Sequence, residues 1–286
     1  MQVGTVTVFR RDKTNVGDWW SPPERYFPLN VLKSIDLIDS AIIPNLNTNY
    51  IVGGGGLGNE SFLPHLNRLT RSDRRYKLIA WGIGADHQVD RNALIKRPDN
   101  FDALLDYFSS FDEVGTRIFI PTGFGERTNY HWVPCASCMS PLFRQLSDIK
   151  PTQRIGFFSH KRVPLSERGR RTSKIRNMRS LLVDRKTHFN NNGSDFKRKL
   201  SALAQCEFVV TNSYHGVYWA TLLGRKVICQ PFKDGLYTFK HSPVYLLEDK
   251  LEQAMEKAKN YPEALEDCRL ANVKYYNYLT EKYGLI

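Results

Sequence analysis

The histidine at position 215 has chemically suggestive neighbours. It belongs to the segment Thr211-Asn212-Ser213-Tyr214-His215-Gly216, which lies between a β-branched strand pattern and an apolar helix pattern. His215 is therefore expected near a helix N-terminus, where the helix dipole favours anions and disfavours protonation of an imidazole. An anion bound alongside restores that protonation, so His215 is a candidate acid near neutral pH. The alternative is a histidine that only caps the helix.

A second candidate group, Asn15-Val16-Gly17-Asp18, follows the first expected strand. Glycine permits a tight turn close to a ligand, and the Asp18 carboxylate is a candidate base. Taken alone, the motif is more typical of a turn in which Asp18 caps the next helix.

Four consecutive glycines, Gly53 to Gly56, follow the strand-like residues Tyr50 to Val52. Such a run lets the backbone approach a phosphate or a sugar. It serves equally well as a strand-to-helix turn that needs positive φ angles. A weaker copy, Trp81-Gly82-Ile83-Gly84, follows the next strand. The G-x-x-x-x-G-K-[ST] pattern does not occur, so an ordinary P-loop is not predicted.

Cys135 and Cys138 have the spacing of a zinc or redox pair. A structural zinc site needs four ligands, and His131 is the only nearby addition. No metal site is therefore predicted. The five cysteines are too few for a disulfide scaffold and favour a reducing, cytoplasmic setting.

The net charge of +12 is concentrated in the second half of the sequence. Residues 1–150 carry 17 basic and 16 acidic side chains, whereas residues 151–286 carry 24 and 13. The segment from His160 to Arg179 contains eight Lys and Arg residues and one acid, Glu167. It suits a phosphorylated substrate or an anionic membrane surface, or it is a solvated loop. No nucleic-acid-binding motif accompanies it, so nucleic acid is not an expected partner.

Alternating strands and helices position these candidates. The pattern predicts two α/β domains, 1–150 and 151–286, each a parallel sheet with flanking helices. Expected strands are Val3–Phe9, Tyr50–Val52, Lys77–Trp81, Glu113–Gly115, Arg154–Phe158, Phe208–Thr211 and Lys226–Cys229. Expected helices are Leu29–Ile38, Phe62–Leu69, Phe101–Phe108, Ser194–Ala204, Tyr214–Leu223 and two in Leu251–Tyr283. Ligands of such sheets gather at the carboxyl ends of the strands, hence at an interdomain cleft.

In this order, the motifs resemble the polysaccharide pyruvyl transferase family. The resemblance rests on Asn15–Asp18, Ile51–Gly56, Trp81–Gly84, Val114–Arg117 and above all Ser213–Ile228. It extends to about residue 232 and implies two Rossmann-like domains in a GT-B-like arrangement. It also implies transfer of pyruvate from phosphoenolpyruvate to a sugar diol as a cyclic ketal. In such proteins a last helix often folds back onto the first domain.

One position departs from the family pattern. Members often have an arginine two residues before the motif histidine, where this chain has Ser213. The anionic donor then needs another cation, for which Arg162, Lys161 and Lys240 are the candidates in that order.

The reaction requires one acid, one base and fixed cations, because the donor is an enol ether with two anionic groups. His215 suits the acid and Asp18 the base. The expected donor side, the second domain, contributes Arg162, Lys161, Ser213, Tyr214 and Lys240. The expected acceptor side, the first domain, contributes Asn15, Gly17, Gly54, Gly55 and Gly56. No cofactor beyond the donor is predicted.

Three functions stay open. The first is a pyruvyl transferase acting on a cell-surface polysaccharide or its lipid-linked precursor, with peripheral contact to the inner face of the membrane. The second is a GT-B-like glycosyltransferase that uses a nucleotide sugar. The third is a nonenzymatic binder of an anionic polymer or membrane through the basic segment.

Overall fold

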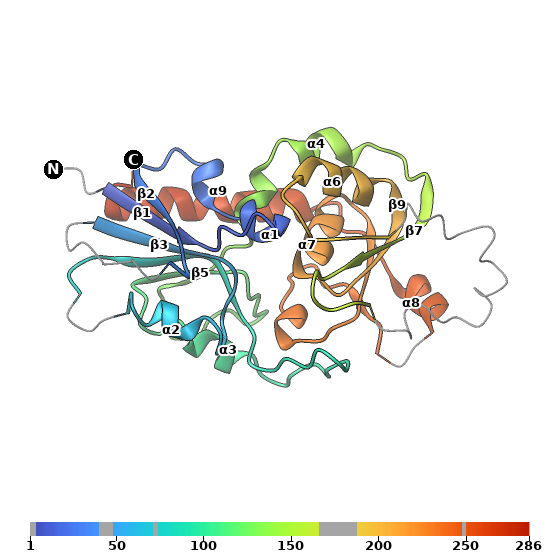
Figure 1. Ribbon diagram of the computed structural model, residues 1–286, viewed down its shortest axis with the longest axis horizontal. Coiled ribbons are helices and arrows are strands. Elements are labelled where there is room, and N and C mark those ends of the chain that lie inside the picture. The colour runs from blue at the N-terminus through green and yellow to red at the C-terminus, as the bar shows by residue number, and fades with distance from the viewer. Residues whose placement is uncertain (1–3, 40–47, 71–73, 166–187, 248–249, 286) are drawn as a thin grey trace.

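Two parallel sheets stand side by side in the molecule (Figure 1). The computed structural model describes residues 4–39, 48–70, 74–165, 188–247 and 250–285. Every pairing between named strands in these ranges is parallel. Parallel strands need crossover connections, which explains why helices lie between successive strands in the sequence.

The N-terminal sheet has six strands in the order β2-β1-β3-β4-β5-β6. They are β1 (Gly4–Phe9), β2 (Val31–Asp36), β3 (Thr48–Gly58), β4 (Leu78–Ala85), β5 (Glu113–Thr116) and β6 (Tyr130–Trp132). The connecting helices are short: α1 (Val16–Trp19), η1 (Pro23–Arg25), α2 (Leu63–Leu66) and α3 (Asp102–Asp106). The central strands β3 and β4 are buried along almost their whole length, as expected for a sheet covered on both faces.

The helix predicted over Leu29–Ile38 is wrong, because residues Val31–Asp36 form the edge strand β2. This segment pairs in parallel with β1, with Thr7 opposite Ser34 and Val8 opposite Ile35. A short apolar pattern fits either a helix or a strand, and here the pairing with β1 decides the outcome. Of the predicted helix Phe62–Leu69, only Leu63–Leu66 is α-helical.

The glycines do not end their strands, so the predicted glycine turns are also wrong. Strand β3 continues through Gly53–Gly58 and β4 through Gly82 and Gly84. Gly56 pairs with Gly84, and a Cβ on Gly53 would overlap the carbonyl oxygen of Trp81. The absence of side chains lets the two strands stay paired despite irregular backbone angles, such as φ +66° at Gly54.

The C-terminal sheet has five strands in the order β11-β10-β9-β7-β8. They are β7 (Gln153–Ser159), β8 (His188–Asn190), β9 (Cys206–Thr211), β10 (Lys226–Cys229) and β11 (Val244–Tyr245). The remaining elements are η2 (Ala136–Met139), α4 (Leu142–Ser147), α6 (Phe196–Ala204), α7 (Tyr214–Leu222), η4 (Asp234–Tyr237), α8 (Leu251–Lys257) and α9 (Ala264–Tyr283). Helix α4 packs with α6, so the hydrophobic core of this half includes residues before position 150.

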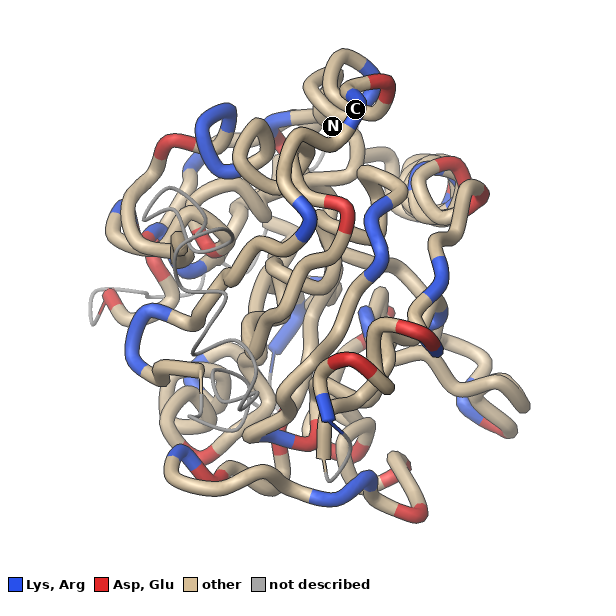
Figure 2. Tube along the Cα trace, turned by 90° about the vertical axis from the view of Figure 1, so that its right-hand side faces the viewer, with Lys and Arg blue, Asp and Glu red and all other residues tan. Residues whose placement is uncertain are grey.

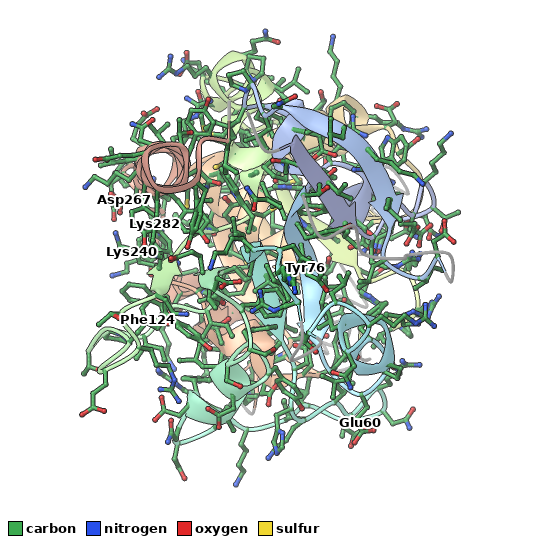
Figure 3. All side chains as sticks on the ribbon, turned by 90° about the vertical axis from the view of Figure 1, so that its left-hand side faces the viewer. Glu60, Tyr76, Phe124, Lys240, Asp267 and Lys282 are labelled. Carbon is green, nitrogen blue, oxygen red and sulfur yellow. The ribbon has the colours of Figure 1, made fainter. Side chains whose placement is uncertain are left out.

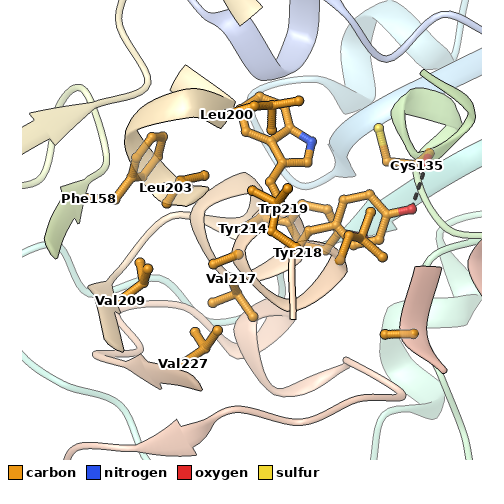
Figure 4. Close-up of a cluster of buried hydrophobic side chains, with 14 of the residues drawn as sticks. Cys135, Phe158, Leu200, Leu203, Val209, Tyr214, Val217, Tyr218, Trp219 and Val227 are labelled. Atoms are coloured by element: carbon orange, nitrogen blue, oxygen red, sulfur yellow. Dashed lines mark hydrogen bonds between the residues drawn. The ribbon is translucent and has the colours of Figure 1, made fainter. Parts of the chain in front are cut away.

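Helix α7 is the centre of the C-terminal core (Figure 4). All its residues are buried, which is why it is apolar around its whole circumference rather than along one stripe. The Trp219 side chain is 0% exposed and packs on Phe196, with ring centroids 4.9 Å apart. The Tyr218 hydroxyl donates to the carbonyl of Cys135 at 2.8 Å. Replacing Trp219 by alanine would cost about 3–5 kcal/mol of stability.

The last helix, α9, packs against the N-terminal sheet (Figure 1). The Tyr275 hydroxyl donates to the carbonyl of Ala80 at 2.9 Å, and Trp81 Nε1 donates to Asn272 Oδ1 at 2.9 Å. Near its C-terminus, Lys282 Nζ donates to the buried Glu113 carboxylate at 2.6 Å. Since α9 follows the C-terminal sheet in sequence, it ties the two halves together.

Segments that follow the strands of one sheet contact those of the other. Val16 N donates to the carbonyl of Asn191 at 3.0 Å, and Gly193 N donates to that of Thr14 at 3.1 Å. On the other side, Lys233 Nζ donates to Asp86 Oδ2 at 2.7 Å. The carboxyl ends of both sheets therefore face each other. The predicted fold, two Rossmann-like α/β domains in a GT-B-like arrangement, is confirmed.

Candidate functional site

His215 lies on α7 directly after β9, at the junction of the two sheets, and its side chain is 5% exposed. Its ring packs against Trp219, with centroids 4.7 Å apart, and against Gly17 of α1, where a Cβ would overlap Nδ1. The Nε2 atom is buried and has no hydrogen-bond partner among the described residues. Since buried polar atoms are nearly always paired, this nitrogen is a point at which a ligand can bind.

Burial lowers the pKa of His215 well below its ordinary value, and the cations Arg117 and Lys233 add to the effect. The same field acts on His160, which follows β7. Burial lowers the pKa of His160 to about 4, with contributions from Lys233, Lys161 and Arg162. Both imidazoles are therefore neutral in the free protein, and the surrounding potential is positive. Such a potential attracts an anion.

Asp18 lies in α1, one residue after the glycine that contacts His215. Burial raises the pKa of its carboxyl to about 6, although Arg10 opposes the shift. Asn15 Nδ2 donates to Asp18 Oδ2 at 2.7 Å, and the Asn15 Oδ1 accepts from Gly17 N at 3.2 Å. Asn15 thus orients the carboxylate as well as capping α1. A group with a pKa near 6 is largely ionised at pH 7 and is suited to accept a proton.

The three glycine candidates of β3 face different side chains, and Gly55 is the one that faces Asp18. A Cβ on Gly54 would overlap the Ser21 hydroxyl, and a Cβ on Gly56 would lie 2.6 Å from Asp86 Oδ2. At Gly55 (φ +139°) the same atom would lie 3.6 Å from Asp18 Oδ1. Bare backbone therefore lies beside the carboxylate oxygen that Asn15 does not hold.

Two of the three predicted cations are engaged in ion pairs. Lys161 Nζ donates to Asp12 Oδ2 at 2.5 Å and to Thr14 Oγ1 at 3.0 Å, which joins the two domains. Lys240 Nζ donates to Asp267 Oδ2 at 2.7 Å. Arg162, the first choice from the sequence, is exposed.

Arg117 is the cation that sequence reasoning missed. It follows β5, is 5% exposed and lies with its guanidinium carbon 3.7 Å from the centre of the Tyr214 ring. Within the described parts of the chain, its side chain has no hydrogen bond or ion pair, and its contact is with the Tyr214 ring. A buried guanidinium without an anion is costly, so its position favours a bound anionic ligand. In the sequence, the one indication that Arg117 belongs to the site is its position at the end of the Val114–Arg117 motif.

Lys233 and Asp86 form an ion pair between the domains that sequence reasoning also missed. Each follows a strand, β10 and β4 respectively, and Asp86 is 5% exposed. The second Asp86 oxygen, Oδ1, is buried and has no partner in the described ranges. Beside this pair, Asp234 accepts from the backbone of His87 at 3.0 Å and Gln88 at 2.8 Å. These contacts hold the loops after β4 and β10 together next to His215.

The remaining donor-side candidates, Ser213 and Tyr214, are both buried. Ser213 occupies the N-cap position of α7, but its side chain makes no capping hydrogen bond to the helix. Its backbone N–H donates to Thr211 Oγ1 at 3.0 Å. The Tyr214 ring lies between Arg117 and Phe239, with the latter centroid 4.9 Å away. Tyr214 therefore supports the guanidinium, while Ser213 shapes the turn before His215.

The cysteine pair is a packing element of the C-terminal core. All five cysteines are free and buried. Cys135 Sγ lies 3.2 Å from Ser137 Oγ, which accepts from Trp219 Nε1 at 3.0 Å. Across the described ranges, no three His, Cys, Asp or Glu side chains are grouped so as to hold a metal ion.

Most of the basic segment, including its residues at 168, 170, 171, 174, 176 and 179, lies outside the described residues. Figure 2 shows that Lys and Arg elsewhere on this side of the molecule alternate with Asp and Glu along the trace. No described helix is both long and apolar enough to cross a bilayer.

Comparison with known proteins identifies a family. The family model described as polysaccharide pyruvyl transferase matches residues 4–229, which is most of the chain. No curated protein matches the chain by sequence.

Several solved structures are similar to the chain at low sequence identity. KP1_0663, an uncharacterised protein from Klebsiella pneumoniae, is 15% identical with a TM-score of 0.42 over 79% of this chain and 82% of that chain. A proposed UDP-N-acetylglucosamine 2-epimerase from Listeria monocytogenes is 10% identical with a TM-score of 0.49, over 95% of this chain and 90% of that chain. The wall teichoic acid polymerase TagF is 9% identical with a TM-score of 0.44, over 99% of this chain and 88% of that chain.

Proposed function

The chain belongs to the polysaccharide pyruvyl transferase family, and we propose that phosphoenolpyruvate is its donor and a cyclic pyruvate ketal its product. Family membership implies a transferase that acts on polysaccharide. The proposed acceptor is a sugar diol of a cell-surface polysaccharide or its lipid-linked precursor. We place the reaction in the cytoplasm, with peripheral contact to an anionic membrane.

Arg117 carries the proposal. Its buried guanidinium has no anionic partner in the described parts of the chain and lies over the Tyr214 ring. The Tyr214 ring centroid is in turn 5.3 Å from that of His215, whose Nε2 is unpaired. Phosphoenolpyruvate has a phosphate and a carboxylate close together on three carbons. Arg117 can bind one of these groups, and Lys233 adds positive charge from the opposite domain. Arg117 then takes the place of the family arginine that is missing at Ser213, because Lys233 is already paired with Asp86.

His215 supplies the proton that starts the reaction. The bound donor offsets the positive field of Arg117 and Lys233, so the His215 pKa rises and the imidazole becomes protonated. Transfer of that proton to C3 of the enol turns C2 into an oxocarbenium-like centre. A sugar hydroxyl attacks C2, phosphate leaves, and the second hydroxyl closes the ketal.

Asp18 accepts the proton of the attacking hydroxyl. Its Oδ1 is the oxygen not held by Asn15, and it lies beside Gly55. One of the two hydroxyl protons restores His215 and the other leaves with the phosphate, so the protons balance. We assign the acceptor to the N-terminal domain. The donor is assigned to His215 and its neighbours in the C-terminal domain, together with Arg117, which follows β5 of the N-terminal sheet. Gly17, Gly54, Gly55 and Gly56 then provide the backbone surface on the acceptor side.

Donor binding and phosphate release test this proposal separately. Saturation with phosphoenolpyruvate at about 100 times its Kd should stabilise the protein by about 2.7 kcal/mol in a thermal shift assay. Arg117→Ala should weaken that binding about 10- to 150-fold, the value of a charged hydrogen bond. Arg127→Ala is the matched control, because Arg127 pairs with Asp102 and Asp106 on the surface.

Phosphate release in the presence of a polysaccharide acceptor should vanish in His215→Ala. Undiminished release in that variant would contradict the role of His215. Stabilisation by a UDP- or GDP-sugar, without stabilisation by phosphoenolpyruvate, would instead indicate a GT-B-like glycosyltransferase.

A further inference from the structure

An open groove runs along α9, between this helix and β6. Its volume is about 510 Å³, within the range of small-molecule sites. One wall is α9, and the other is β6 with the segment before it. Phe124, Lys240 and Asp267 mark this side of the molecule in Figure 3.

Flat aromatic surfaces line the groove from both walls. Trp132 and Phe124 come from the sheet side and Tyr278 from α9, and all three are partly exposed. His131 packs on Tyr278 with ring centroids 4.8 Å apart, and Lys240 Nζ lies 4.9 Å from the centre of the Trp132 ring. Aromatic faces of this kind pack well against the C–H faces of sugar rings.

Polar groups with free hydrogen-bonding capacity lie among these rings. Asp267 uses Oδ2 for Lys240 at 2.7 Å and His241 at 3.1 Å, while Oδ1 has no partner in the described ranges. Lys274 is exposed and likewise has no ion pair with any described residue. His131 Nε2 lies 3.5 Å from the buried Glu113 carboxylate, which favours the proton on that nitrogen. Its Nδ1 is then an acceptor.

The groove adjoins the catalytic cluster. A smaller hollow next to it is lined by Arg117 and Tyr214 and shares Trp132 and Lys240 with the groove. The shared residues therefore place the groove next to Arg117, while the hollow itself, with a volume of about 20 Å³, has room for roughly one water molecule. This continuity distinguishes the groove from an isolated surface depression.

We infer that the groove along α9 binds an oligosaccharide segment of the acceptor polymer and holds the chain beside the catalytic cluster. The occupant is a polyhydroxylated chain, because aromatic faces alternate here with an unpaired carboxylate oxygen, an ammonium and an imidazole acceptor. That the bound saccharide is the acceptor polymer rests on the proposed function. That it is a polyhydroxylated chain rests on the residues that line the groove.

Affinity electrophoresis tests the inference without knowledge of the natural polymer. Native gels containing dextran, galactan or alginate should retard the wild-type protein. Ala271→Trp places an indole in the groove and should abolish the retardation, and Lys274→Ala should weaken binding about two- to tenfold. Lys33→Ala, an exposed lysine on the far edge strand, is the matched control and should bind like wild type. Stabilisation by phosphoenolpyruvate serves as the test of folding.

Three results would overturn the inference: no retardation of wild type by any of the three polymers, equal retardation of Ala271→Trp, or a wild-type dimer that Ala271→Trp converts to a monomer. The last would show that the groove joins two copies of the chain. Loss of donor binding with normal retardation would contradict the proposed donor and leave the groove standing.

Discussion

The Cα of Gly17 faces the imidazole of His215 so closely that a Cβ at position 17 would overlap Nδ1. The two residues belong to different domains, and their contact sets the position of the proposed acid relative to Asp18, the next residue along α1. Glycine at position 17 is therefore a requirement of the site, besides any role in the turn. His215 is fixed by Trp219 on its other side, so it has little room to retreat.

Gly17→Ala should reduce kcat for phosphate release about 100-fold, the cost of moving a catalytic group by roughly 1 Å. Donor binding through Arg117 should remain, as measured by thermal shift with phosphoenolpyruvate. Gly123→Ala is the control for strain away from the site: its added Cβ meets no atom within 4 Å, and its φ of +78° costs stability without any contact to His215. Full activity in Gly17→Ala would show that His215 does not need this position.

Asp18 and Asp12 should respond to pH with opposite signs. Burial raises the pKa of Asp18 to about 6, above an unfolded value of 3.8, so the charged form destabilises the fold once the pH rises through this interval. Asp18→Asn should therefore raise the Tm at pH 8 and leave it unchanged near pH 4. The same variant should abolish phosphate release, because the amide cannot accept a proton.

Asp12 is the matched opposite case. Burial alone would raise its pKa, but hydrogen bonds from Lys161 and Thr14 outweigh this and lower the pKa to about 2. Its charged form stabilises the fold above pH 3.8, and that stability is lost as the pH falls toward 2. Asp12→Asn should lower the Tm at pH 7, with a difference that shrinks on acidification. A change in Tm of the same sign in Asp18→Asn and Asp12→Asn above pH 7 would contradict these assignments.

Elements with strong local signals could be predicted from the sequence. Strand β10 was predicted as Lys226–Cys229, as the structure has it, because a β-branched run is bounded by Arg225 and Pro231. Helix α7 begins at Tyr214 as predicted, and Gly224 follows its end with φ +69°. The ends of these two elements are determined by residues within or directly beside them, so they can be predicted from the local sequence.

Features that depend on distant partners could not be predicted. Residues Val31–Asp36 form a strand because they pair with β1. The glycines of β3 stay in the sheet because they pair with β4, which also contains glycines. Arg117 was part of a quoted motif, but its lack of an anionic partner is a property of the folded chain. Conversely, Lys161 and Lys240 looked available in the sequence and are engaged by carboxylates in the structure.

The cysteine residues should be unreactive in the folded protein. Burial raises the pKa of Cys135, and it raises that of Cys138 to about 12, so thiolate is scarce at neutral pH. All five cysteines are buried and free. Dithionitrobenzoate should therefore modify none of them within minutes at pH 7.5 and all five in strong denaturant. Rapid reaction of Cys135 or Cys138 in the native protein would revive the redox interpretation of this pair.

Binding of phosphoenolpyruvate should take up protons. In the free protein the His215 pKa is lowered by burial and by Arg117 and Lys233, so the imidazole is neutral at pH 7. A bound donor, with its phosphate and carboxylate, raises this pKa, and the complex then holds a proton that the free protein lacks. Affinity should accordingly fall as the pH rises above neutral. Calorimetric titrations in two buffers of different ionisation enthalpy measure the uptake directly.

His215→Gln should remove most of this proton uptake while retaining donor binding through Arg117. His160→Gln is the control: His160 also has a lowered pKa, about 4, but contacts Phe232, with ring centroids 5.5 Å apart, rather than Gly17. Proton uptake that persists in His215→Gln and disappears in His160→Gln would assign the acid to His160, after β7, instead of His215 on α7. The proposed acid is thus tested by where the proton binds, independently of which polysaccharide accepts the pyruvyl group.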